Sequence, residues 1–384
     1  MPWRERSAMD ERLECVRLAL LPGANRSELA RRFGVSRTNL YKWLHRFELE
    51  GQAGLEERSR RPLRSPFKTA CAIEKEVLRL RKDSNGAWGG RTIAHVLRDE
   101  DVVSHVPSPS TITEILRRHD KLEASADAHP GPYQRFEREA PNELWQMDFK
   151  GHFELMRGRC HPLTVVDDHS RFALAVDACG DEQARTVQDR LTRAFRRYGM
   201  PLAILADNGP PWASPYGGHT ILTVWLNRLG VRVHHGRPFH PQTQGKDERF
   251  HRTISAEVLN GRSFVDLASC QAAFDRFRHR YNHRRPHQAL GMATPDTRYR
   301  ISPRRFPEQL PPIDYGDGAI VRKVDSDGYI SFRNRPWRIG FPFKKQPVAL
   351  RPGRDDGLFT VYFCVQLIGT IDLRKPAQQP HPEI

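Results

Sequence analysis

Three acidic residues lie at positions where their side chains could reach the edge of a sheet, where a site can form. Asp148 lies in WQMDF, a segment with the composition of a strand, and Asp207 lies in LADNGP, where a strand ends and Asn-Gly turns the chain. Glu248 lies early in a helical segment and falls outside the apolar stripe that begins at Phe250. The stripe therefore gives no structural reason for an acid at position 248.

Each acid has an ordinary explanation taken alone, because turns and helix N-termini often contain Asp and Glu. The surroundings of Glu248 argue against coincidence, since it is flanked by the cationic or titratable residues Lys246, Arg249, His251 and Arg252. Oxygen ligands suit Mg²⁺, and three carboxylates can hold two such ions for phosphodiester chemistry. The sequence predicts that these three carboxylates are catalytic and bind metal, and that Lys246, Arg249 and Arg252 contact nucleic-acid phosphates.

The composition fits this chemistry without requiring it. A formal net charge of +16 favours a polyanionic partner, although an ordinary basic surface that aids solubility would give the same surplus. The six cysteines are scattered, so neither a disulfide framework nor a zinc site is expected. The length of 384 residues predicts two to four domains. Because the N-terminal segment is charged and no apolar run could span a bilayer, we expect a cytoplasmic, nucleoid-associated protein with no membrane partner.

The N-terminal part has the layout of a helix-turn-helix. Residues 27–33 are expected to form a helix, Gly34-Val35-Ser36 a tight turn, and the following segment a second helix with Leu40, Leu44 and Phe47 inward. The residues left pointing outward are the predicted DNA contacts Arg37, Thr38, Asn39 and Lys42. A small helical bundle with a solvated polar face is the alternative.

A second helical unit is expected over residues 69–119, with Trp88-Gly-Gly opening one helix and Ser110 another. It resembles a second helix-turn-helix, and Arg117 and Arg118 near its end either contact phosphates or are solvated. Residues 121–142 are polar with little periodicity and are expected to form a linker.

Beyond residue 142 the pattern changes to strands. Three short strands joined by tight turns, followed by alternating helices and strands, predict a mixed α/β domain. From residue 313 to 373 the pattern is again that of strands, broken by Asp-Gly pairs, and predicts a small all-β barrel. The predicted divisions are 1–62, 63–120, the linker 121–142, 143–302 and 303–384.

Five motifs, in chain order, carry a resemblance to a known family. They are WQMDF with Asp148, VVDDHSRF from Val165, LADNGP with Asp207, HPQTQGKDERFHRT with Glu248, and YNHRRPHQALGMATP from Tyr281. With these motifs the chain resembles bacterial insertion-sequence transposases of the integrase-core kind, which are related to retroviral integrases. The resemblance implies a ribonuclease H-like core with a mixed five-stranded sheet. The zinc-binding domain of retroviral integrases is missing, and helix-turn-helix units occupy its place.

The resemblance implies that Asp148, Asp207 and Glu248 form the acidic triad and that two Mg²⁺ or Mn²⁺ ions are the cofactor. It implies cleavage and joining of double-stranded DNA at transposon ends and in target DNA, by at least a homodimer, with no small-molecule substrate and no covalent enzyme intermediate. Two alternatives stay open. A domesticated, catalytically silent DNA-binding regulator would be expected to have lost a triad member, and a nuclease acting on RNA–DNA hybrids would not need the helix-turn-helix units.

Several further residues receive roles from their position. Asp168 is expected to cap the turn in VVDDHSRF, with a place beside the metal ions as the alternative. Asn208 and Gly209 are expected to shape the turn that presents Asp207, and His240 lies near the substrate or is structural. The basic and aromatic run after the catalytic helices is expected to contact phosphates through Arg284 and Arg285, a solvated helix end being the alternative.

Overall fold

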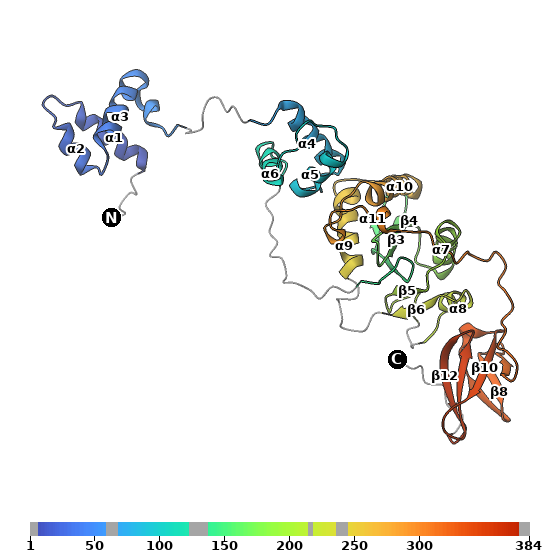
Figure 1. Ribbon diagram of the computed structural model, residues 1–384. Helices are drawn as coiled ribbons and strands as arrows, with labels where there is room; N and C mark the ends of the chain where they lie inside the picture. Colours follow the sequence, from blue (N-terminus) through green and yellow to red (C-terminus); the bar gives the residue numbers. More distant parts are fainter. Residues whose placement is uncertain (1–6, 59–67, 123–136, 214–217, 236–244, 376–384) are drawn as a thin grey trace. The chain divides into compact units, whose positions relative to one another are not determined.

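The computed structural model describes residues 7–58, 68–122, 137–213, 218–235 and 245–375. The chain divides into two compact units, Met1–Lys68 and Thr69–Ile384 (Figure 1). The finer division expected from the sequence stays a prediction. His240 and most of the expected linker lie outside the described residues.

In residues 7–58, the described part of the first unit, the chain forms three short α-helices and a final turn. These are α1 (Ala8–Ala19), α2 (Arg26–Arg32), α3 (Arg37–Glu50) and the 3-10 turn η1 (Gly51–Leu55). The side chain of Ser36 caps α3 by accepting a hydrogen bond from the backbone N–H of Asn39 at 3.2 Å. Leu40 and Leu44 are buried in the small core, which confirms the expected helix, turn and helix.

The second helical segment opens the other unit. Its helices are α4 (Cys71–Asp83), α5 (Gly90–Asp99) and α6 (Pro109–Arg118). Helices α5 and α6 pack closely because Gly90 has no side chain: a Cβ there would meet the carbonyl oxygen of Pro109 at 2.3 Å. Helix α5 begins at Gly90, as expected from the segment Trp88-Gly-Gly, and Trp88 is buried in the core that these helices share.

A mixed sheet forms the centre of the second unit. Its strands are β1 (Leu144–Phe149), the two-residue β2 (Phe153–Glu154), β3 (Arg159–Asp167), β4 (Ala173–Cys179), β5 (Ala203–Ala206) and β6 (Arg232–His235). Strand β1 pairs with β3 antiparallel and with β5 parallel; β4 pairs with β3, and β6 with β5. The five expected strands are present, and short β2 adds a sixth at the edge of β3.

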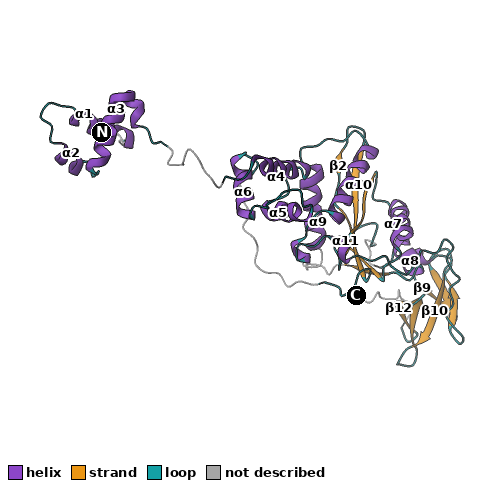
Figure 2. Ribbon diagram, turned by 45° about the horizontal axis from the view of Figure 1, so that its top comes forward, coloured by secondary structure: helices purple, strands orange, loops and turns teal. Residues whose placement is uncertain are grey.

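Helices cover both faces of this sheet (Figures 1 and 2). They are α7 (Ala184–Tyr198), α8 (Ile221–Arg228), α9 (Gly245–Ile254), its π-helical continuation η3 (Ser255–Leu259), α10 (Leu267–His283), the 3-10 turn η4 (Gln288–Leu290) and α11 (Pro295–Arg298). Helices α7 and α8 pack on one face with Trp145 and Met147 in their core. Helices α9 and α10 pack on the other face against Val166 and Val176. Because alternate residues of a strand face opposite sides, Asp148 faces α9.

The C-terminal part is a small all-β unit. Its strands are β7 (Ile320–Lys323), β8 (Tyr329–Phe332), β9 (Arg335–Arg338), β10 (Pro347–Pro352), β11 (Leu358–Phe363) and β12 (Gln366–Asp372), with the 3-10 turn η5 (Phe341–Phe343). They pair as one four-stranded and one two-stranded antiparallel sheet. The described pairing confirms an all-β unit but not closure into a barrel. No helix in the described ranges is long and apolar enough to cross a membrane.

Candidate active site

Strand pairing brings two of the three expected acids together. Strands β1 and β5 are parallel, with Gln146 opposite Leu205, so the same register continued by two residues places Asp148 beside Asp207. The turn after β5 then holds Asp207 at the sheet edge, where its Oδ1 accepts a hydrogen bond from the backbone N–H of Gly209 at 3.0 Å. The expected role of Gly209 in shaping that turn is therefore confirmed.

The pKa values of both carboxyl groups are raised. Burial, and then the negative charge of Asp207, raise the pKa of Asp148 to about 7. The pKa of Asp207 is also raised, chiefly by burial. Glu182, which pairs with His161 at 2.7 Å, contributes a further negative charge that raises both pKa values. Because ionisation of these two half-buried acids is unfavourable without a counter-charge, a cation bound between them would be stabilised.

Glu248 is the third expected acid, and its side chain is exposed near the start of α9. The same helix contacts the first acid through His251, whose Nδ1 lies 3.9 Å from Oδ2 of Asp148 and whose Nε2 lies 2.9 Å from Oγ1 of Thr164. Burial, and then the charge of Lys150, lower the pKa of His251 to about 4, so this ring is neutral at pH 7. Among the described residues, no three His, Cys, Asp or Glu side chains are already arranged as a metal site.

The neighbouring acid Asp247 was not expected and is the buried one. Burial, followed by the charges of Asp148 and Asp168, raises its pKa well above the ordinary value. Its Oδ1 has no hydrogen-bond partner among the described residues. Asp247 precedes Phe250 by three positions, so helical spacing already placed it on the buried side of α9. The sequence thus contained the signal that an acid lies beneath the site.

Asp168 corrects an expectation, because it does not cap its turn. The turn is capped by Asp167, which accepts hydrogen bonds from the backbone N–H and hydroxyl of Ser170 at 2.8 and 2.6 Å. Asp168 is buried and instead accepts a hydrogen bond from the Gln146 amide at 2.5 Å and pairs with the ammonium group of Lys246. This pair ties the start of α9 to the sheet. Lys246 is therefore engaged within the chain.

The other predicted DNA contacts divide into exposed and engaged cations. Arg37, Thr38, Asn39 and Lys42 are exposed on α3, and Arg249 and Arg252 are exposed on α9. Arg284, by contrast, pairs with Glu100, the residue that follows α5, and Arg285 pairs with the buried Glu257 at 3.0 Å. Tyr281, from the same basic and aromatic run, is buried against Phe250 and belongs to the core. Whether any of these residues contacts DNA stays a prediction.

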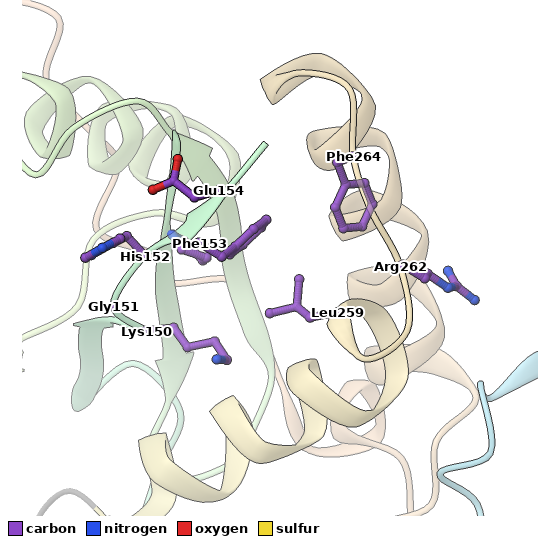
Figure 3. Close-up of a pocket in the computed structure, with 9 residues that line it drawn as sticks. Lys150, Gly151, His152, Phe153, Glu154, Leu259, Arg262 and Phe264 are labelled. Carbon is purple, nitrogen blue, oxygen red and sulfur yellow. The ribbon is translucent and has the colours of Figure 1, made fainter. Parts of the chain in front are cut away.

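A pocket of about 220 Å³ lies between the β1–β2 turn and the segment that includes the end of η3 and the residues after it (Figure 3). Phe153, Leu259 and Phe264 give it an apolar lining. Lys150 lies at its edge and is also the cation whose charge lowers the pKa of His251. The lining of the pocket thus begins two residues after Asp148 in the sequence.

Models of known families match nearly every part of the chain. Two integrase core domain models match residues 138–241 and 229–295, and a model of the C-terminal domain of IS481 family transposases matches 319–379. A helix-turn-helix model matches residues 11–62, and a homeodomain-like model matches 39–116.

Curated relatives point the same way. The chain is 32% identical over 156 residues to an uncharacterized 31.7 kDa protein of insertion element IS407 from Burkholderia multivorans, covering 41% of this chain and 54% of that protein. It is 22% identical over 371 residues to a putative transposase for insertion sequence element IS5376 from Geobacillus stearothermophilus, covering 92% of this chain and 85% of that one. The chain spans about half the length of the first curated relatives it matches.

Solved structures with some likeness are retroviral. The chain matches a chain in the structure of the simian T-cell lymphotropic virus intasome in complex with PP2A regulatory subunit B56 gamma, with 16% identity and a TM-score of 0.39, over 78% of this chain and 96% of that one. It matches the HTLV-2 integrase catalytic core domain, solved with magnesium, with 17% identity and a TM-score of 0.32, over 42% and 99%. Likenesses at these TM-scores carry no weight for fold or function. On the family models and the curated relatives, the chain belongs to the insertion-sequence transposases that have an integrase core domain and N-terminal helix-turn-helix domains.

Proposed function

We propose that the protein is a transposase that cuts double-stranded DNA at the ends of its insertion sequence and joins the freed 3′ ends to target DNA. The observation that carries this proposal is the pair Asp148 and Asp207, side by side on adjacent parallel strands with the pKa of Asp148 raised by the charge of Asp207. The integrase core matches over the same residues support the reaction class.

We assign Glu248 as the third acid from its place on α9. It precedes His251 by three residues, so the two side chains are neighbours on one side of the helix, at roughly 5 to 6 Å between Cβ atoms. Since His251 lies next to Asp148, Glu248 is within one helical turn of the acid pair. Its exposure leaves it free to turn toward a bound ion and DNA.

The donor set fits Mg²⁺ or Mn²⁺. Asp148, Asp207 and Glu248 offer only carboxylate oxygens, which are the ligands that these cations prefer, and the first two repel one another without a cation. Bound there, two divalent ions would supply Lewis-acid stabilisation to the attacking and the leaving oxygen of a phosphodiester.

The chain's own residues would place the DNA strand for this reaction. Arg249 and Arg252 are exposed cations on the helix that carries Glu248, and they would hold backbone phosphates on either side of the scissile bond. His251, neutral at pH 7, would keep Asp148 in place without adding charge. Water would attack first and the new 3′ hydroxyl second, so no nucleophilic side chain is required.

Recognition of the ends is assigned to the helical units. Arg37, Thr38, Asn39 and Lys42 form the exposed face at the start of α3, the position from which a recognition helix reads the major groove. We propose that the β unit contacts DNA or a second subunit, and that two copies at least assemble because two ends must be brought together.

The test is a joining assay with purified protein, duplexes carrying the element's own ends, a supercoiled target plasmid and Mg²⁺. The proposal expects end duplexes to become covalently joined to the plasmid, with no joining in EDTA and none with duplexes of scrambled sequence. Binding of the ends without any cut or joined product, in Mg²⁺ and in Mn²⁺, would contradict it.

A further inference from the structure

A buried glutamate in η3, the continuation of α9, accepts hydrogen bonds from three segments of the chain. The side chain of Glu257, in η3, has no exposed surface. Its Oε1 accepts hydrogen bonds from the indole N–H of Trp88 at 3.1 Å and from Nε of Arg285 at 3.0 Å. Its Oε2 accepts from Arg280 of α10 at 2.9 Å. A buried carboxylate is tolerated only when it is paired in this way.

Trp88 belongs to the second helical segment, so Glu257 joins that segment to the catalytic domain. A second contact joins the same two parts independently. The side-chain amide of Asn85 donates to the backbone carbonyls of Ala256 and Asn260 at 3.0 and 3.1 Å. Asn85 has a φ of 53°, a left-handed conformation that asparagine adopts more readily than most residues.

The backbone at the receiving end is itself unusual. Residues Ser255–Leu259 form a π-helical turn, in which the N–H of Asn260 bonds to the carbonyl of Ser255 at 2.8 Å. A π-turn within a helix is rare and is frequently found at functional positions. Here the turn lies where the helix meets Asn85 and Trp88. A third pair, Arg284 with Glu100, is more exposed and adds little.

The π-helical turn η3 and the proposed third acid, Glu248, lie on one continuous helical stretch. Glu248 is in the first turns of α9 and Glu257 is nine residues further on, about 13 Å at 1.5 Å per residue. The second helical segment therefore contacts the C-terminal end of this helical stretch, at η3, while Glu248 lies near its N-terminal end. Any DNA bound by helices α4–α6 would be held at a set distance from the carboxylates.

We propose that the contact of Trp88 and Asn85 with η3 is a positioning device that determines which phosphodiester is cut. It rests on the proposed function, and it assigns Trp88, Asn85 and Glu257 as positioning residues. A loosened contact lets the DNA-bound segment shift relative to Asp148, Asp207 and Glu248, so cuts spread to neighbouring phosphodiesters. A contact that served only stability would change the amount of active protein and leave the cut position alone.

The experiment maps cut positions on an end-labelled duplex of the element's terminal sequence in Mg²⁺. Trp88→Phe retains an aromatic ring and removes the N–H that Glu257 accepts. Trp337→Phe is the matched control, because Trp337 is equally buried, at 2% exposure, and its indole N–H donates to the Phe332 carbonyl within the C-terminal sheets. Asn85→Gly keeps the left-handed backbone and removes the side-chain amide.

The expected result is one cut position for the wild type and Trp337→Phe, and a several-fold rise in cuts at neighbouring positions for Trp88→Phe and Asn85→Gly. Cuts confined to the wild-type position in both test variants, at any rate, would overturn the inference while leaving the proposed function intact. Should Trp88→Phe not fold, Asn85→Gly decides alone. A wild type that binds its ends and cuts nowhere contradicts the proposed function, and the inference falls with it.

Discussion

Asp148 and Asp207 lie side by side at the ends of neighbouring parallel strands, and the negative charge of Asp207 adds to burial in raising the pKa of Asp148 to about 7. The metal-free pair is therefore electrostatically unfavourable when both groups are ionised. A divalent cation would relieve that repulsion. Through the ionisation of this pair, both the free energy of unfolding and the metal affinity should depend on pH.

The first prediction concerns stability without metal. Between about pH 4 and about pH 7 the folded state retains a proton on Asp148 that the unfolded chain has lost, so the free energy of unfolding falls as pH rises through this window. Asp148→Asn removes that contribution. Urea unfolding in EDTA should show that the wild type loses more stability than Asp148→Asn between about pH 5 and about pH 7.5.

Other groups also make the free energy of unfolding depend on pH, and His251 does so with the opposite sign. Because both proteins contain these groups, the comparison with Asp148→Asn cancels their contributions. Mg²⁺ should restore stability to the wild type at the higher pH and have little effect on the variant. Asp207→Asn, which lacks the neighbouring charge, should fall between the two in its pH dependence. Parallel pH profiles for the wild type and Asp148→Asn would show that the pair is not coupled as described.

The second prediction concerns the ion pair that ties α9 to the sheet. Asp168→Asn can still accept a hydrogen bond from Gln146 but leaves the partly buried ammonium group of Lys246 unpaired. Breaking a buried pair from one side typically lowers the free energy of unfolding by about 3 kcal/mol or more. Denaturant unfolding measures it, with Glu308→Gln, in the exposed pair with Arg196, as a control that changes little. A decrease in the free energy of unfolding no larger than that of the control would show that the pair does not stabilise the fold as described.

The third prediction separates the exposed from the engaged cations. Arg37→Ala and Lys42→Ala should weaken binding to the element's ends and flatten the dependence of log affinity on log salt by about one unit for each lost phosphate contact. Arg284→Ala should leave the salt slope unchanged, because Arg284 already pairs with Glu100. Fluorescence anisotropy across a salt series measures both. The reverse pattern would move the DNA interface from α3 to the end of α10.

Local signals were sufficient for most elements. The turn Gly34-Val35-Ser36 predicted the break between α2 and α3 because Ser36 caps the next helix with its own side chain. The acids Asp148 and Asp207 were placed correctly at a sheet edge, since strand ends and Asn-Gly turns are readable in short segments. Within residues 313–373, where strands were expected, the local signals for β9 and β12 are weaker: β9 contains Pro336, which argues against a strand, and β12 contains Gly369.

Long-range pairing accounts for what the sequence did not show. The partner of Lys246 is Asp168, 78 residues away, and the donors to Glu257 include Trp88, 169 residues away. No local pattern distinguishes a lysine that will pair with a buried acid from one that will meet a phosphate. The same holds for Arg284 and Arg285, whose basic run indicated DNA before Glu100 and Glu257 were known to lie beside them.

The central claim is that Asp148, Asp207 and Glu248 act together in DNA cutting and joining. The most direct measurement is joining of the element's ends to a supercoiled plasmid in Mg²⁺ by the wild type, Asp207→Asn, Glu248→Gln and the control Glu308→Gln, each first shown to bind the ends equally. The account predicts joined products from the wild type and the control and none from the two triad variants. Joining by Glu248→Gln at the wild-type rate would contradict the assignment of the third acid, and joining by Asp207→Asn would contradict the site itself.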